Sequence, residues 1–250
     1  MKKNGFKRYL LVMSIFLCIQ LIPLSGHSQK QENSESIIDQ KVKSFLISQR
    51  YKWKEDNIPF ADGKVLYNLI LRHEYTKALE VGTSTGHSAI WMAWALSKTG
   101  GKLITIEIDE ERHKRALENF SECGLSDYID ARLADAHDFV PELEGPFDFV
   151  FIDADKDWYI NYFKLILPKL EVGGCFTAHN VSNLKYNPGI KKFLDYVNSL
   201  PYMETTIDQS SWTGISISYK RKEVKSEELD SSIQMFFRPV LPNVCLKISP

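Results

Sequence analysis

This chain of 250 residues has almost no net charge. Its 31 lysine and arginine residues are balanced by 32 aspartate and glutamate residues, so the net charge is −1 when the histidines are neutral. The sequence also lacks a basic stripe with interleaved aromatic side chains, which is the pattern typical of nucleic-acid binding. We therefore expect no nucleic-acid partner.

Cysteine is scarce, and its distribution does not indicate a disulfide framework. The chain has 4 cysteines, and those beyond residue 28 are Cys123, Cys175 and Cys245. An odd number of cysteines provides no complete set of pairs. We expect Cys123, at the end of a predicted helix, and Cys175, in a predicted strand, to be buried apolar side chains. Cys245 is either free or paired.

A long apolar run near the N-terminus has the features of a targeting segment. Residues 9–24 are almost wholly apolar, follow a basic stretch and precede the small residues Gly26 and Ser28. This order is typical of a secretory signal peptide that is cleaved after Ser28. The run is shorter than the ~20 residues of a membrane-spanning helix. We predict that residues 1–28 are a signal peptide and that the exported protein has no stable membrane insertion; an N-terminal membrane anchor is the alternative.

Beyond a polar linker at residues 29–36, the chain alternates helical patterns with short apolar runs. Predicted strands are 78–81, 103–106, 129–133, 147–152, 174–178, 205–207 and 214–219. Predicted helices are 37–49, 61–75, 88–97, 110–123, a short one near 137, 158–170 and 190–200. This alternation indicates βαβ units, hence a Rossmann-like doubly wound α/β sheet of about seven strands, mainly parallel, with an antiparallel edge hairpin and helices on both faces. We assign it to residues 37–220, followed by a tail at 221–250.

A glycine loop follows the first predicted strand and opens the next helix. Gly82 and Gly86 permit a tight turn and close approach of a ligand, and the helix start offers free N–H groups to an anion. The spacing is G-x-x-x-G rather than the G-x-G-x-x-G of dinucleotide enzymes, so an amino-acid carboxylate fits better than a pyrophosphate. Ser88 contributes a hydroxyl to that carboxylate or is an ordinary serine at a helix start. The predicted ligand-binding residues of this segment are Glu80, Gly82, Ser84, Gly86 and Ser88.

The next two strand ends carry residues suited to a nucleoside. Glu107 lies ~20 residues after the glycine loop, where an acidic side chain hydrogen-bonds ribose hydroxyls. Asp109 is instead expected to cap the following helix. Asp135 and Ala136, after the third strand, are expected beside an adenine. The three strand ends together predict a nucleoside ligand.

The fourth predicted strand ends in a cluster of charge, Asp153-Ala154-Asp155-Lys156-Asp157. Ligands of open α/β sheets bind beyond the carboxyl ends of the strands, so this cluster is placed to hold a metal or a reacting group. A plain polar turn is the alternative interpretation.

These segments together resemble the cation-dependent small-molecule O-methyltransferases, the family of catechol and caffeoyl-CoA O-methyltransferases. The resemblance runs from Asn57 to Tyr219 and is carried by residues 80–88, 104–109, 147–159, 173–181 and 214–219. It implies S-adenosylmethionine as the methyl donor, a small phenolic or catechol-like acceptor, and a homodimer.

The resemblance also implies a divalent metal and a general base. Asp153 matches the family's first metal-ligating Asp and is expected beside the donor as well, and Lys156 matches the base. The family's ligating Asp-Asn pair corresponds to His179-Asn180, so a histidine replaces an aspartate. With a neutral imidazole among its ligands, the site is expected to prefer Mn²⁺, Fe²⁺, Co²⁺ or Zn²⁺ over Mg²⁺ or Ca²⁺. Alternatively, His179 points elsewhere and metal binding is weakened or lost.

Two other functions share the predicted sheet. An NAD(P)-dependent oxidoreductase is disfavoured by the glycine spacing and by the Asp153/His179/Asn180 set. A non-catalytic S-adenosylmethionine-binding or interaction protein is favoured by His179 and by export, because the donor is made in the cytosol. Candidates for an aromatic acceptor pocket are Trp53, Phe60, Trp158, Tyr186 and Trp212.

Overall fold

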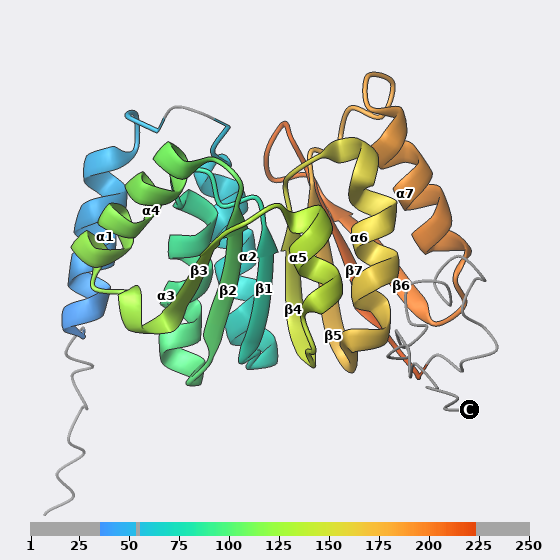
Figure 1. The fold of residues 1–250 in the computed structure, drawn as a ribbon, viewed down its shortest axis with the longest axis horizontal. Helices are drawn as coiled ribbons and strands as arrows, with labels where there is room; N and C mark the ends of the chain where they lie inside the picture. Colours follow the sequence, from blue (N-terminus) through green and yellow to red (C-terminus); the bar gives the residue numbers. More distant parts are fainter. Residues whose placement is uncertain (1–35, 54–55, 224–250) are drawn as a thin grey trace, which may run out of the picture. The chain divides into compact units, whose positions relative to one another are not determined.

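A computed structural model describes residues 36–53 and 56–223, so the predicted signal peptide, most of the linker and nearly all of the tail lie outside the described residues. The described residues form a seven-stranded sheet of order β3-β2-β1-β4-β5-β7-β6 (Figure 1). The strands are β1 (Lys77–Val81), β2 (Lys102–Glu107), β3 (Ile129–Leu133), β4 (Phe147–Ile152), β5 (Leu170–His179), β6 (Met203–Asp208) and β7 (Ile215–Lys220). Strands β1 to β5 pair in parallel, and β7 pairs antiparallel with both β5 and β6. The predicted sheet with its antiparallel edge is confirmed.

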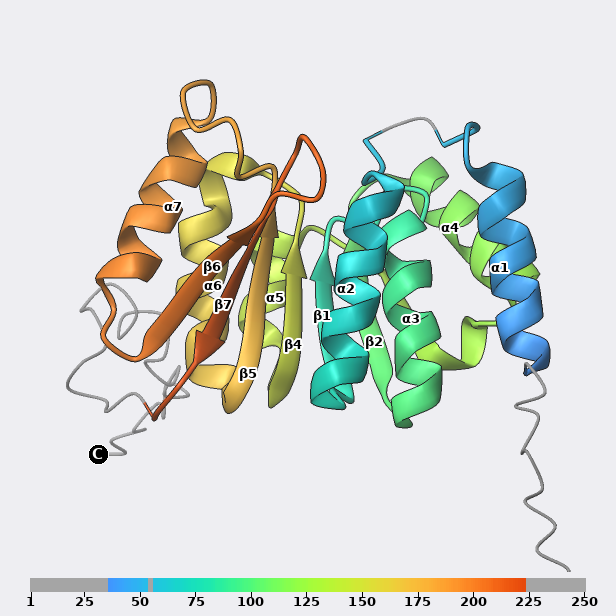
Figure 2. The same ribbon diagram turned by 180° about the vertical axis from the view of Figure 1, so that it is seen from behind.

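Helices cover both faces of the sheet (Figures 1 and 2). The helices are α1 (Ile37–Gln49), α2 (Phe60–His73), α3 (His87–Thr99), α4 (Glu110–Cys123), α5 (Ala136–Glu142), α6 (Tyr159–Ile166) and α7 (Pro188–Ser199). Buried side chains of α1 to α4 share one hydrophobic cluster, and those of α5 to α7 share another. The sheet therefore separates two cores, as a doubly wound fold requires.

The helix predicted over residues 158–170 is shorter than expected. Helix α6 ends at Ile166, and a 3₁₀ turn at Leu167–Lys169 leads directly into β5 at Leu170. Pro168 has no N–H and its ring crowds the preceding turn, so it ends the regular helix. Strand β5 is correspondingly longer than the predicted strand at 174–178.

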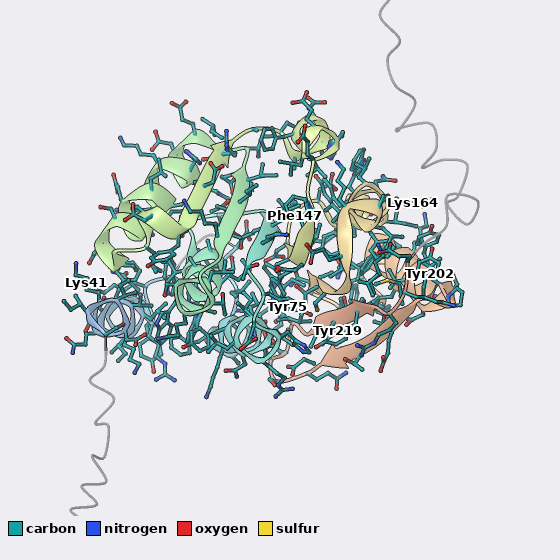
Figure 3. The ribbon with its side chains drawn as sticks, turned by 90° about the horizontal axis from the view of Figure 1, so that it is seen from below. Lys41, Tyr75, Phe147, Lys164, Tyr202 and Tyr219 are labelled. Carbon is teal, nitrogen blue, oxygen red and sulfur yellow. The ribbon has the colours of Figure 1, made fainter. Side chains whose placement is uncertain are left out.

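Side-chain hydrogen bonds connect the strands at the amino-terminal end of the parallel sheet, and one of the residues that make them, Tyr75, is labelled in Figure 3. The carboxylate of Asp148 accepts hydrogen bonds from Thr76 N (2.7 Å) and Lys77 N (2.8 Å). The hydroxyl of Tyr75 donates to the carbonyl of Gly173 at 2.8 Å. These contacts tie the entry of β1 to β4 and β5. They leave the opposite end of the sheet for ligands.

Two further expectations concern cysteine and the membrane. Cys123 and Cys175 are both buried free thiols, as predicted. Cys245 lies outside the described residues. Over residues 36–53 and 56–223, no helix is both long enough and apolar enough to cross a membrane.

Candidate active site

A cavity of about 850 Å³ opens where the parallel strands β1 to β5 end. Its wall combines residues that follow these strands with the segment before α2 and the loop before β7. A cavity of this size encloses a ligand of several hundred daltons. Of the predicted site residues, Gly82, Ser84, Glu107, Asp135, Ala136, Asp153, Lys156, His179 and Asn180 lie on the wall.

The glycine loop passes very close to the end of β4. Gly82 has φ +98°, and a Cβ there would lie 2.9 Å from the Cβ of Ala154 and 3.0 Å from the backbone carbon of Asp153. A side chain at this position would therefore be strained in its backbone and would push the two strand ends apart. Glycine at position 82 therefore allows the loop after β1 to lie directly against Asp153 and Ala154 after β4.

Glu80 and Ser88, both predicted to bind the ligand, lie behind the loop rather than on the cavity wall. The Glu80 side chain is fully buried and accepts hydrogen bonds from Thr105 Oγ1 and Ser88. Its Oε1 has no hydrogen-bond partner among the described residues. Burial raises the pKa of Glu80 to about 8, and the nearby carboxylates of Asp153 and Glu107 act in the same direction. Gly86 also lies behind the wall, where it begins α3 against Phe120.

The carboxylate of Glu107 is held rigidly on the wall. It accepts hydrogen bonds from three backbone N–H groups: Ser84 at 2.6 Å, Ile108 at 3.1 Å and Asp109 at 3.0 Å. Asp109 caps α4 through Arg112 N, as expected. The ribose role of Glu107 stays a prediction, and its side chain lies on the wall of the cavity.

His137 was not singled out from the sequence, yet it joins two strand ends. Its ring nitrogens lie 2.7 Å from Asp135 Oδ1 and 2.9 Å from Asp155 Oδ2. Burial works against its charge, but the two carboxylates outweigh burial and raise the pKa of His137. Trp158 packs edge-on against this ring, with the centroids 4.3 Å apart. Trp158 therefore supports the wall of the cavity and does not line it.

Four residues other than glycine adopt left-handed backbone angles on the cavity wall. Ser84 (φ +49°), Asp155 (φ +48°) and Asn180 (φ +61°) each lie at a strand end, and Asp56 (φ +51°) lies before α2. Such angles cost of order 1–3 kcal/mol for residues other than glycine and cluster at functional sites. Asn180 tolerates the conformation best, because its side chain can bond to the local backbone.

The charged cluster is built from neighbouring strand ends. The register of β4 and β5 pairs Ile152 with Ala178, so the residues that follow, Asp153 and His179, are neighbours. His179 Nδ1 lies 3.0 Å from Asp153 Oδ2. Lys156 Nζ, half-exposed, lies 3.3 Å from Asp153 Oδ1. The cluster therefore presents a carboxylate, an imidazole and an amine to one part of the cavity.

Asp62 of α2 completes this cluster and was missed in the sequence. Its Oδ2 lies 2.8 Å from His179 Nε2 and accepts a hydrogen bond from Thr213 Oγ1 at 2.6 Å. An acidic residue in a first helical turn is common, so the sequence carries no signal that separates Asp62 from an ordinary surface residue.

The two carboxylates favour positive charge between them. Burial alone would lower the pKa of His179, but Asp153 and Asp62 outweigh burial and raise it to about 9. Burial likewise opposes the charge of Asp62, whose pKa is nevertheless lowered by hydrogen bonds from His179, Ser211 and Thr213.

The aromatic candidates divide into two groups. Trp53, Phe60 and Trp212 line the cavity, and Trp53 stacks on His87 with centroids 4.4 Å apart. Trp212 is 83% exposed and stands at the mouth. Neither Trp158 nor Tyr186 lines the cavity. Tyr186 is largely exposed. The cavity is thus aromatic on the side of α2 and the loop before β7.

Known proteins resemble this chain in sequence. A family model described as O-methyltransferase matches residues 28–184. Catechol O-methyltransferase from Niastella koreensis is 41% identical over 123 residues, which are 48% of this chain and 55% of that protein. Caffeoyl-CoA O-methyltransferase 1 from Eucalyptus globulus is 32% identical over 139 residues, 54% of this chain and 56% of that protein. The matched part spans just over half the length of these relatives.

Solved structures share the architecture. An O-methyltransferase from Bacillus cereus in complex with SAH is 27% identical, with a TM-score of 0.62 over 73% of this chain and 91% of that chain. The SAH-bound methyltransferase PaMTH1 from Podospora anserina has a TM-score of 0.65 over 89% of this chain and 100% of that chain. At 19% identity, the second likeness concerns the fold alone.

Proposed function

Because this chain belongs to the O-methyltransferase family, we propose that it transfers the methyl group of S-adenosylmethionine to a hydroxyl of a small phenolic or catechol-like acceptor. The observation that carries the proposal is a single cavity with two unlike halves. One half holds the glycine loop and the fixed carboxylate of Glu107, and the other holds Asp153, Lys156 and His179. The first half suits a nucleoside donor, and the second suits a hydroxyl that must lose a proton.

The donor binds beside the ends of β1, β2 and β3. Glu107 accepts hydrogen bonds from the ribose hydroxyls. The backbone at Gly82 and Ser84 approaches the amino-acid end of the donor, and Asp135 and Ala136 lie beside its base. The close approach of Gly82 to Ala154 supports a position of this ligand next to Asp153 and Lys156. Its sulfonium methyl then faces the acceptor.

Methyl transfer in this site is a direct displacement. A lone pair of the acceptor oxygen forms a bond to the methyl carbon, and the pair of the broken C–S bond stays on sulfur. The products are a methyl ether and S-adenosylhomocysteine. Lys156 Nζ accepts the hydroxyl proton and passes it to solvent, because this amine is half-exposed. The aromatic side chains of Trp53, Phe60 and Trp212 hold the ring of the acceptor at the correct distance.

The residues present fit a divalent cation. Asp153 Oδ2 and His179 Nδ1 lie 3.0 Å apart. A carboxylate oxygen and an imidazole nitrogen are both common ligands of divalent transition metals. In the described part of the chain, no group of three or more His, Cys, Asp or Glu side chains is arranged as a metal site. The proposed ligand set therefore takes Asn180 as its third member. A divalent cation held by these residues would supply positive charge that lowers the pKa of the acceptor hydroxyl.

The test is methyl transfer from labelled S-adenosylmethionine by the full-length protein to a panel of catechols and other phenols. Donor binding is measured separately by calorimetry. Lys156→Ala should lose at least 100-fold in kcat and retain donor affinity, whereas Lys192→Ala, an exposed lysine of α7, should retain both. Unchanged turnover in Lys156→Ala would remove this residue from the mechanism. Donor binding with no turnover on any acceptor would favour the non-catalytic alternative.

A homodimer and export from the cytosol stay predictions. The segment that carries the targeting signal, residues 1–28, lies outside the described residues. Fractionation of cells that produce the full-length protein would test export, and light scattering would test the dimer.

A further inference from the structure

The buried carboxylate of Asp62 has no role in the chemistry described above. Its side chain is 1% exposed, and within the described residues its Oδ1 has no hydrogen-bond partner. Burying a carboxylate is costly unless opposite charge and hydrogen bonds compensate it. A position so costly, directly behind a cavity, calls for a functional reason.

We propose that Asp62 is a positioning residue that makes His179 a metal ligand. The carboxylate accepts a hydrogen bond from Nε2–H and thereby turns Nδ1 towards Asp153 and the cavity, where a bound cation would take the place of the Nδ1 proton. Metal-ligating histidines commonly donate their second N–H to a carboxylate, which fixes both tautomer and ring orientation. The proposal rests on the proposed function and deepens it by identifying how the unusual ligand is held.

The backbone fixes Asp62 in this place. Gly63, the next residue of α2, packs so tightly on α3 that a Cβ there would lie 2.1 Å from Trp91 Cδ1. On the other side, Thr213 Oγ1 donates to Asp62 Oδ2, the same atom that His179 Nε2 approaches at 2.8 Å. The carboxylate is therefore clamped between a strand end and the loop before β7.

The ligand set decides the class of metal. Asp153, His179 and Asn180 offer one carboxylate oxygen, one imidazole nitrogen and one amide oxygen. Mg²⁺ and Ca²⁺ prefer oxygen ligands alone, whereas Mn²⁺, Co²⁺ and Zn²⁺ accept imidazole readily. We infer that the site binds these transition metals more tightly than Mg²⁺, and that Asp62 is required for the difference.

The test measures metal binding directly. Free Mn²⁺ is followed by electron paramagnetic resonance as it is titrated into the metal-free full-length protein, with Mg²⁺ as competitor. Asp62→Asn keeps the shape of the side chain but removes the negative charge that favours a proton on Nε2, so Mn²⁺ affinity should fall 10- to 100-fold. Asp195→Asn, an exposed aspartate of α7, should leave Mn²⁺ affinity unchanged.

A second readout separates positioning from a loss of structure. In protein loaded with Zn²⁺ and ¹⁵N-labelled histidine, nuclear magnetic resonance should report His179 with a protonated Nε2 and a coordinated Nδ1. Asp62→Asn should shift this tautomer while donor binding by calorimetry stays unchanged. Equal Mn²⁺ affinity in Asp62→Asn and the parent protein would overturn the proposal, as would the opposite tautomer.

The outcome for the metal is distinct from the outcome for the proposed function. Metal binding that depends on Asp62, without methyl transfer to any acceptor, would support this inference and count against the function. Methyl transfer that persists in excess chelator, with no Mn²⁺ bound, would support the function and overturn this inference.

Discussion

Glu80 should make the stability of the protein fall as pH rises through neutrality. Its pKa is raised from 4.5 in the unfolded chain to about 8 in the fold, chiefly by burial. Between these two values the folded state keeps a proton that the unfolded state has lost. The free energy of unfolding therefore decreases with pH in this window, by about 1.4 kcal/mol per pH unit. Over the whole window the effect is on the order of 5 kcal/mol.

Glu80→Gln is the variant that tests this reasoning. The amide has the shape of the protonated acid and no charge to bury, so the decrease between pH 5 and pH 6.5 should largely disappear. Above pH 6.5 a smaller decrease should remain, because the pKa of His179 is raised from 6.5 to about 9 in the fold. Urea unfolding at half-unit steps of pH would measure the free energy of unfolding of the parent, of Glu80→Gln and of Glu118→Gln, an exposed control. Parallel curves for the parent and Glu80→Gln would refute the assignment of the pH dependence to this buried carboxyl.

Three further predictions concern positions elsewhere in the fold. Asp148→Ala leaves the backbone N–H groups of Thr76 and Lys77 without their acceptor and should cost about 3 kcal/mol of stability in urea unfolding. Gly82→Ala should weaken donor binding in calorimetry at least 10-fold, because its Cβ would meet Ala154 and the backbone of Asp153. Trp212→Ala should raise the acceptor KM several-fold and change the free energy of unfolding by less than about 0.5 kcal/mol, because the side chain is mostly exposed at the mouth of the cavity.

Most of the sheet could be read from local patterns. The helices are identified by a period of about 3.6 residues and the strands by short apolar runs, and both signals involve neighbours in the sequence alone. The boundary at Pro168 was misjudged because apolar residues continue through it, while the missing N–H ends the helix. The antiparallel edge followed from the absence of a helix between the last two strands.

The donor half of the site was also predictable, because strand ends of parallel strands meet at one edge. The sequence could not tell which residues of the loop face the ligand. Glu80 and Ser88 bond to each other behind the wall, while Gly82, Ser84 and Glu107 stand on it. That difference depends on the side of the loop to which each side chain turns.

The sequence by itself determined the sheet, the order of its strand ends, and the replacement of an expected aspartate by His179. Only the tertiary structure decided what His179 does, because its partner Asp62 is 117 residues away along the chain. The packing of α2 on α3 brings Asp62 to that ring, and the register of β4 and β5 brings Asp153 to its other side. Periodicity specifies which face of a helix is buried but not which single atom of another element it meets, so this contact exists only in the folded chain.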